Sequence, residues 1–146
     1  MKQLFLFDVD GTLTPSRGKI QEDFRLWLTG FAEQNACCLV TGSDQEKTIE
    51  QIGEYLYNKF LFQFQCSGNQ IWTGTDTKIY ESEWKLGSEP CQWLFRSLKN
   101  SKFPLRTGKH FEHRPGMVNF SIVGRNATLG ERKLYVEYDK EHNERE

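Results

Sequence analysis

The chain has 146 residues and a formal net charge of -1 at pH 7, with a sequence pI near 6.3. The length suits one modest domain, and the charge balance gives no reason to expect a nucleic-acid partner. The first apolar stretch is too short for a signal peptide or a membrane-spanning helix, so we expect a soluble cytoplasmic protein without a membrane partner. The four cysteines lack metal-binding spacing and are expected to be reduced thiols.

The first element is an apolar strand over residues 4–7, and two carboxylates follow it at once. Because side chains on a strand alternate between faces, Asp8 and Asp10 are expected to point the same way, and Gly11 permits a tight turn after them. Two carboxylates this close repel each other unless a cation lies between them. One can act as a nucleophile and the other as a proton carrier, with a divalent ion holding the pair. An ordinary Asp-Gly turn after a buried strand is the structural alternative.

The next elements follow in the order helix, strand, helix, strand. Apolar residues at helical spacing predict a helix over Asp23–Gln34, and the short apolar run Ala36–Val40 predicts a strand covered on both faces. Helical spacing resumes over Gln45–Tyr57, and Phe60–Cys66 alternates like a strand. Such crossovers are right-handed and give a parallel sheet, so we expect an α/β core with its site at the carboxyl ends of the strands.

The turn after the second strand is a candidate phosphate site. Thr41 would present its hydroxyl, and Gly42 and Ser43 their backbone amides, to the carboxylate pair across the crevice. The helix that begins after Asp44 adds the partial positive charge of its N-terminus. Alone, this string is also typical of a capped turn, and its position after the second strand is what favours the phosphate site.

The second half differs in character, and we expect a domain boundary that separates residues 1–78 from residues 79–146. Turn signals and changes of period define the elements of this region. The expected elements are a hairpin turn over Gly74–Thr77, a helix over Cys91–Lys99, a hairpin within Gly108–Val123 that turns at Arg114–Gly116, a helix over Leu129–His142 capped by Thr128, and a fraying tail from Asn143.

Three arginines recur in this half. Planar guanidinium groups match phosphate oxygens, so Arg114, Arg125 and Arg132 could hold a second phosphate away from the chemistry if they converge on one face. Solvated surface arginines are the alternative, because charged residues are mostly exposed.

The string D-V-D-G-T-L-T after an apolar strand resembles the first motif of the haloacid dehalogenase superfamily, and Thr41 stands in the matching position of its second motif. The resemblance implies that Asp8 attacks phosphorus to form an aspartyl-phosphate. It implies that Asp10 protonates the leaving group and then deprotonates the acceptor. It also implies a magnesium ion, Mg2+, on the Asp8 carboxylate and the backbone carbonyl of Asp10.

A closer resemblance is to the eukaryotic-type phosphomannomutases, carried by the strings R-P-G-M-V-N, I-V-G-R-N-A-T-L-G-E-R, Y-D-K and G-S-D-Q-E-K-T-I-E-Q-I-G. These enzymes interconvert hexose 6-phosphate and hexose 1-phosphate through a hexose 1,6-bisphosphate, which is also their activator. The implied fold is a Rossmannoid parallel-sheet core of the haloacid dehalogenase type with an inserted α+β cap, and the implied assembly is a homodimer through the cap. The implied substrate-binding residues are Arg17 in the core and Arg114, Asn119, Arg125 and Arg132 in the cap.

Three positions depart from the usual pattern of this family: Ser67, Pro115 and Gly130. The strings of the third and fourth motifs do not occur, so we expect the core and the cap both to be incomplete and magnesium binding to be weak. Two alternatives therefore stay open. One is a sugar-phosphate phosphatase, in which water attacks the aspartyl-phosphate, and the other is a non-catalytic sugar-phosphate binding module.

Overall fold

The computed structural model describes residues 3–16 and 18–145, and the chain divides into two compact units, Met1–Trp84 (unit 1) and Lys85–Glu146 (unit 2). The boundary expected after residue 78 lies inside strand β5 (Thr77–Glu81). Because β5 pairs antiparallel with β4 (Gln70–Thr73) along its whole length, it stays with unit 1. The division between the compact units therefore comes later than the sequence indicated.

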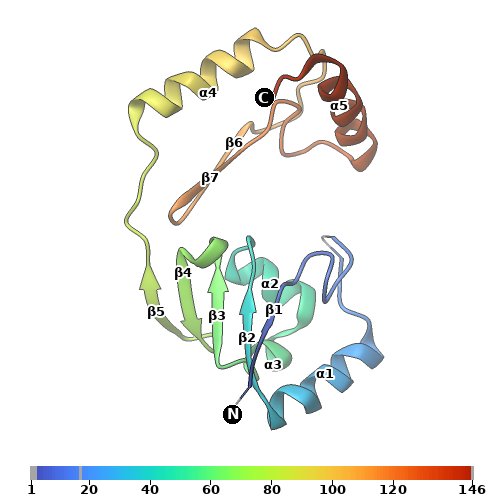
Figure 1. Cartoon of the computed structure of the whole chain (residues 1–146), viewed down its shortest axis with the longest axis vertical. Coiled ribbons are helices and arrows are strands. Elements are labelled where there is room, and N and C mark those ends of the chain that lie inside the picture. The colour runs from blue at the N-terminus through green and yellow to red at the C-terminus, as the bar shows by residue number, and fades with distance from the viewer. Residues whose placement is uncertain (1–2, 17, 146) are drawn as a thin grey trace. The chain divides into compact units, whose positions relative to one another are not determined.

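Unit 1 contains one five-stranded sheet in the order β1-β2-β3-β4-β5 (Figure 1). The first three strands are parallel and the last two are antiparallel. The α/β class and the parallel strand–helix–strand order expected from the sequence are confirmed. In chain order the elements are β1 (Leu4–Phe7), α1 (Glu22–Gln34), β2 (Ala36–Val40), α2 (Gln45–Ile52), α3 (Glu54–Tyr57), β3 (Phe62–Gln65), the 3-10 turn η1 (Cys66–Gly68), β4 and β5.

The helix expected over Gln45–Tyr57 is broken at Gly53. This glycine has a φ of +84°, and its amide caps α2 by donating to the carbonyl of Ile49 at 2.8 Å. A positive φ is readily adopted by glycine and ends an α-helix, so the chain turns there and resumes as α3. The helical spacing of apolar residues did not reveal this break, because Leu56 still lies on the apolar side after it.

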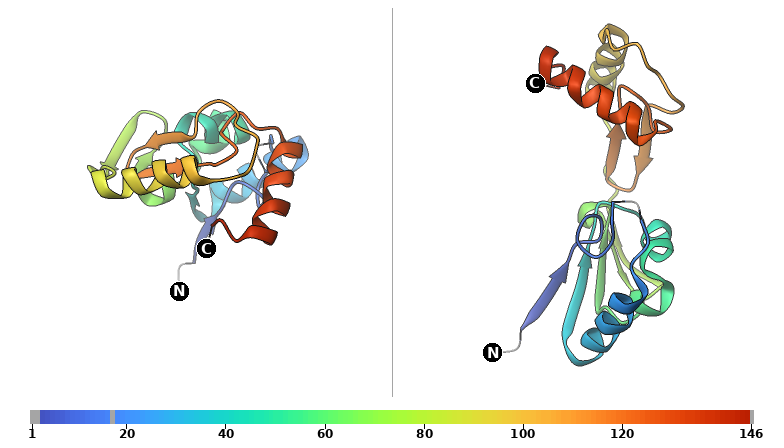
Figure 2. Two further views of the ribbon diagram at one scale, coloured as in Figure 1. Left: turned by 90° about the horizontal axis from the view of Figure 1, so that it is seen from above. Right: turned by 90° about the vertical axis from the view of Figure 1, so that its right-hand side faces the viewer.

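The three helices α1, α2 and α3 lie on one side of the sheet (Figure 2). Leu28 of α1, Ile52 of α2 and Leu39 of β2 are completely buried in the layer between them. Phe5 of β1 meets Phe31 of α1 edge-on, with ring centroids 5.0 Å apart. Burial of each such large side chain stabilises the fold by about 1.5–3 kcal/mol, so this layer anchors the strands whose ends carry the site.

The helix-covered face of β3 carries glutamines instead of apolar residues. Gln63 and Gln65 are fully buried, whereas Phe62 on the other face is 42% exposed. The amide of Gln63 donates to the carbonyls of Tyr57 and Phe60 at 3.0 and 2.8 Å. These hydrogen bonds meet the requirement that buried polar groups be paired.

No helix among the described residues of unit 1 covers the other face of the sheet. Leu4, Leu6, Val40, Phe62 and Phe64 line a shallow apolar groove of about 530 Å³ there. The expectation that Ala36–Val40 is covered on both faces holds for Cys38, which is 2% exposed, but not for Val40, which is 38% exposed. The strand itself forms as expected, because its neighbours β1 and β3 pair with it on both edges.

Unit 2 consists of helix α4 (Ser88–Asn100), the hairpin of β6 (Phe111–Arg114) and β7 (Met117–Phe120), and helix α5 (Leu129–His142). Gly116 supports the hairpin turn with a φ of +65°. A capping box starts α5: the Thr128 hydroxyl accepts the amide of Glu131, whose carboxylate accepts the amide of Thr128. The hairpin and the last helix are thus where the sequence predicted them.

The C-terminal tail is held in place by Glu144, so the expected fraying is wrong up to Arg145. The Glu144 carboxylate accepts hydrogen bonds from the Ser101 hydroxyl at 2.8 Å and the Lys102 amide at 3.2 Å, and from two tyrosine hydroxyls of α5.

Across the described ranges of the chain, no helix combines the length and apolar composition needed to cross a bilayer.

Candidate active site

Asp8 and Asp10 lie directly beyond the carboxyl end of β1. Val9 between them is completely buried, and its carbonyl accepts the amides of Leu13 and Thr14, both at 3.0 Å. Gly11 completes this turn with a φ of +83°. A buried Val9 directs the two aspartates away from the hydrophobic core, as strand alternation predicted.

The Asp8 carboxylate accepts a hydrogen bond from the Thr12 hydroxyl at 3.1 Å. It lines a crevice of about 560 Å³ together with Thr41, Gly42 and Ser67. The structure therefore brings the predicted nucleophile to the same crevice as two of the three predicted phosphate-binding residues. Such a crevice at the carboxyl ends of parallel strands is where open α/β sheets bind ligands.

Ser43, the third predicted phosphate-binding residue, is engaged differently. Its amide donates to the Thr41 hydroxyl oxygen at 3.1 Å, and its own hydroxyl donates to Asp10 Oδ2 at 3.3 Å. Thr41 and Ser43 are both buried. In this arrangement Ser43 holds the turn and the second carboxylate, instead of facing the crevice with its amide.

Gln51 of α2 is a site residue that the sequence reasoning missed. Its side chain is almost completely buried, and its amide nitrogen donates to Asp10 Oδ1 at 3.0 Å and to the Thr14 hydroxyl at 3.2 Å. The same nitrogen lies 3.3 Å from the carbonyl of Gly18. Gln51 and Ser43 thus each hold one oxygen of the Asp10 carboxylate and orient it.

Ser67 is a second residue that the sequence reasoning did not place in the site. It has a φ of +58°, and its amide donates to the carbonyl of Thr41 at 2.9 Å. A left-handed backbone is costly for a residue other than glycine, and such strain gathers at functional sites. The departure of Ser67 from the family pattern marked this residue in the sequence. It did not indicate that Ser67 lies in the site.

In unit 2, Glu112 brings together three of the predicted substrate-binding residues. Its carboxylate pairs with Arg114 at 3.0 Å and with the guanidinium of Arg125, and it accepts a hydrogen bond from the Asn119 amide at 3.4 Å. Burial raises the pKa of Glu112. The hydrogen bond from Arg114 and the charges of both arginines lower it by more than burial raises it, so the net shift of the pKa is downward. Glu112 therefore stays ionised between the two guanidinium groups at neutral pH.

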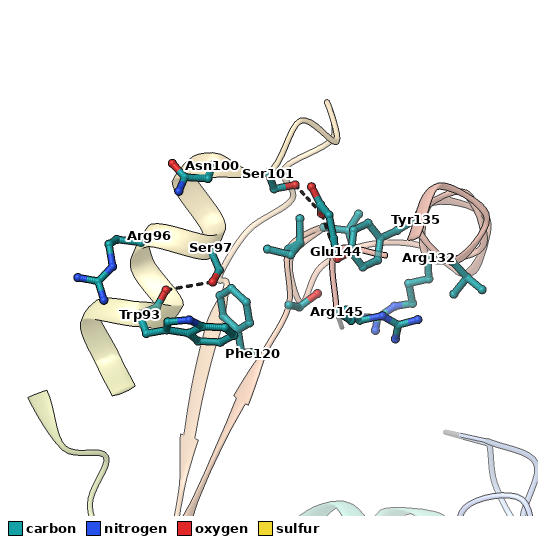
Figure 3. A pocket seen from close by; sticks show the side chains of 14 residues that line it. Trp93, Arg96, Ser97, Asn100, Ser101, Phe120, Arg132, Tyr135, Glu144 and Arg145 are labelled. Atoms are coloured by element: carbon teal, nitrogen blue, oxygen red, sulfur yellow. Dashed lines mark hydrogen bonds between the residues drawn. The ribbon is translucent and has the colours of Figure 1, made fainter. Parts of the chain in front are cut away.

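Arg132 does not join this group through its side chain. Its guanidinium donates to the carbonyls of Ala127 at 3.0 Å and Arg125 at 2.9 Å, so it braces the loop that carries Arg125. It also lines a pocket of about 690 Å³ between α4 and α5, and neither Arg114 nor Arg125 is among the described residues that line this pocket. Figure 3 shows Arg132 and Arg145 on one side of that pocket. Arg17, the remaining predicted substrate-binding residue, lies outside the described residues.

The residues around Asp8 suit a magnesium ion. Magnesium is usually held by one or two carboxylates together with substrate phosphates, and it prefers oxygen ligands. Because Ser43 and Gln51 already hold the side chain of Asp10, the residues fit a division in which Asp8 offers its carboxylate and Asp10 its backbone carbonyl. Within the part of the chain that the structure describes, no three His, Cys, Asp or Glu side chains gather closely enough to hold a metal by themselves.

An aspartate pair at the end of a parallel strand, opposite a Thr-Gly-Ser turn on the next strand, is the arrangement that the resemblance to the haloacid dehalogenase superfamily predicts. The IMP-nucleotidase of Plasmodium falciparum has a similar fold, with a TM-score of 0.51 and 14% identity over 96% of this chain and 46% of that chain. A family model described as eukaryotic phosphomannomutase matches residues 25–146. The chain belongs to the eukaryotic phosphomannomutase family.

Curated relatives agree with this family. The phosphomannomutase of Saccharomyces cerevisiae is 38% identical over 95% of this chain and 57% of its own length. That of Drosophila melanogaster is 36% identical over 98% of this chain and 59% of its own length. The chain therefore spans less than two thirds of the length of these relatives.

Proposed function

We propose that this chain carries out phosphomannomutase-type phosphoryl transfer, interconverting hexose 6-phosphate and hexose 1-phosphate. The observation that supports it most is the placement of Asp8 in one crevice with Thr41 and Gly42, while Asp10 is held beside it. In the proposed reaction the Asp8 carboxylate attacks one phosphorus of the hexose 1,6-bisphosphate, the bond from that phosphorus to the sugar oxygen breaks, and Asp10 gives its proton to this oxygen, which leaves a hexose monophosphate. In the reverse direction the hydroxyl of a hexose monophosphate attacks the phosphorus on Asp8, the Asp8–phosphoryl bond breaks, and Asp10 takes the proton of that hydroxyl.

The phosphoryl group needs donors for its oxygens while it is on Asp8. We propose that the backbone of Gly42 and the hydroxyl of Thr41 supply them, because both residues line the crevice with Asp8. The N-terminus of α2 lies just beyond, where Asp44 accepts the amide of Lys47 at 3.0 Å. A helix start of this kind favours negative charge.

The remaining parts of the proposal are based on the resemblance to the phosphomannomutases. A magnesium ion bound at Asp8 would neutralise charge on the phosphoryl oxygens. A hexose 1,6-bisphosphate would serve as activator, Arg114, Asn119 and Arg125 would bind the phosphate that does not react, and Arg17 would contact substrate from the core side. A homodimer through the cap and a cytoplasmic location complete it.

The test is to incubate the chain with magnesium, mannose 1-phosphate and glucose 1,6-bisphosphate, and to measure mannose 6-phosphate and inorganic phosphate in parallel. A mutase produces mannose 6-phosphate in excess over inorganic phosphate, whereas a phosphatase releases only inorganic phosphate. Substrate binding without either product would indicate a binding module. Asp10→Asn is the control, and loss of a general acid–base group is expected to lower turnover about 10²–10⁴-fold.

A further inference from the structure

Glu112 lies at the centre of a compact group of side chains on the β6–β7 hairpin. In the register of the hairpin it is directly opposite Asn119, and Arg114 is two residues further along the same strand and so shares its face. Arg125 reaches the same carboxylate from the loop between β7 and α5. Three separate segments of unit 2 therefore meet at one carboxylate.

The contacts divide the two oxygens of Glu112 between its partners. Oε1 accepts Nη2 of Arg114 at 3.0 Å, and Oε2 pairs with Nη2 of Arg125 and accepts the amide of Asn119 at 3.4 Å. The Arg114 side chain is only 11% exposed and that of Arg125 is 25% exposed. Glu112 itself is a third exposed, so the group borders solvent from which an anion can approach.

The charge balance of the group favours an additional anion. Two guanidinium groups face one carboxylate, which leaves a net positive charge. Each guanidinium has five N–H donors in a planar fork that matches phosphate oxygens. The contact that each makes with Glu112 through Nη2 directs the guanidinium group toward this carboxylate.

Without the carboxylate, the two guanidinium groups would repel each other and would lose the contacts that orient them toward Glu112. An anion would then have to order both side chains as it binds, and its affinity would fall accordingly. Glu112 is not itself a group that can bind phosphate, because an ionised carboxylate only accepts hydrogen bonds.

We propose that Glu112 is a positioning residue that holds Arg114, Arg125 and Asn119 ready for the phosphate of a hexose phosphate. The identity of that ligand rests on the proposed function, whereas the dependence of anion binding on Glu112 does not. Glu112 acts through the two arginines and does not touch the ligand.

The experiment compares Glu112→Gln with the wild-type chain and with Glu137→Gln, which changes an exposed residue of α5 in the same way. Binding of inorganic phosphate and of mannose 6-phosphate is followed by NMR through the Nε–H signals of Arg114 and Arg125. In Glu112→Gln both ligands are expected to bind about tenfold more weakly or worse, because the arginines lose a charge-assisted contact. Glu137→Gln should bind as the wild type does.

A double-mutant cycle separates positioning from a merely structural role. In an Arg125→Ala background, Glu112→Gln is expected to cost less affinity than in the wild type, because the part of its effect that passes through Arg125 is already lost. A purely structural residue would give additive losses. If Glu112→Gln does not fold, Glu112→Asp serves instead: its shorter carboxylate cannot reach both arginines, so its affinity should also fall.

Unchanged or tighter phosphate binding in the Glu112 variants would overturn the proposal, and so would a wild-type chain whose arginine signals do not respond to phosphate. If phosphate binding depends on Glu112 but Asp8 is never phosphorylated, the proposed function fails and the positioning role stands. If Asp8 is phosphorylated while the Glu112 variants bind phosphate normally, the proposed function stands and the positioning role fails.

Discussion

Replacement of Gln51 by leucine tests whether the buried amide organises the loop that carries Asp10. The leucine side chain is similar in size, so the change removes hydrogen bonds without opening a large cavity. The Gln51 amide donates to the charged Asp10 carboxylate and to the neutral Thr14 hydroxyl, and it approaches the Gly18 carbonyl. All of these contacts lie beneath the β1–α1 loop.

The magnitude follows from these contacts. A hydrogen bond to a charged group contributes about 1.5–3 kcal/mol, and each neutral one about 1 kcal/mol. The oxygen of the Gln51 amide has no hydrogen-bond partner among the described residues, and removing this buried polar atom offsets part of the loss. We expect Gln51→Leu to lower the free energy of unfolding of unit 1 by about 2–4 kcal/mol.

The assay is urea unfolding monitored by hydrogen exchange in peptides of unit 1. These peptides report the stability of this unit apart from that of the rest of the chain. Gln34→Leu is the matched control, because Gln34 is exposed on α1, and it is expected to change stability by about 0.5 kcal/mol or less. Exchange in the β1–α1 loop should rise most in Gln51→Leu. If the two variants differ by less than about 1 kcal/mol, the amide does not hold this loop and the reasoning fails.

Three further predictions concern other parts of the chain. Arg132→Lys should weaken hexose-phosphate binding almost as much as Arg132→Ala, because a lysine cannot hold the Arg125 loop through two carbonyls at once. Binding titrations in which Arg132→Lys binds as tightly as the wild type would contradict this. Phe62→Ser should reduce concentration-dependent association in sedimentation experiments, since Phe62 lines the apolar groove of unit 1 and is 42% exposed. Unchanged association would exclude that face. Burial, with the nearby charge of Glu144, raises the pKa of Tyr135 from 10.0 to about 12, so unit 2 should lose stability between about pH 10 and pH 12, where the unfolded tyrosine ionises and the folded one does not. Tyr135→Phe should remove that part of the pH dependence in urea titrations.

The strands and the position of Asp8 were predictable because they depend on local pattern. Strand alternation and the crossover rule were enough to place Asp8 and Thr41 at the same edge of a parallel sheet, and the structure brings them to one crevice. Thr128 was predicted to cap α5, and the structure shows that Glu131 completes a capping box with it.

The partners of these residues could not be read from the sequence in the same way. Gln51 meets Asp10 across 41 positions of the chain, and a glutamine on a helix has no pattern that marks it as a site residue. The buried glutamines of β3 reverse the usual assignment of polar and apolar faces, which only the hydrogen bonds from Gln63 to Tyr57 and Phe60 explain. Convergence of Arg114 and Arg125 required Glu112, whereas arginine spacing alone treated Arg132 as their equal.

The central claim is that Asp8 receives the phosphoryl group. The most direct measurement is to mix the chain with magnesium and glucose 1,6-bisphosphate, quench in acid, and locate the added phosphoryl group by mass spectrometry of the peptides. We expect one phosphorylated residue, Asp8, and no phosphorylation in Asp8→Asn, whose amide cannot attack phosphorus. Phosphorylation that persists in Asp8→Asn, or that appears on another residue of the wild-type chain, would contradict it.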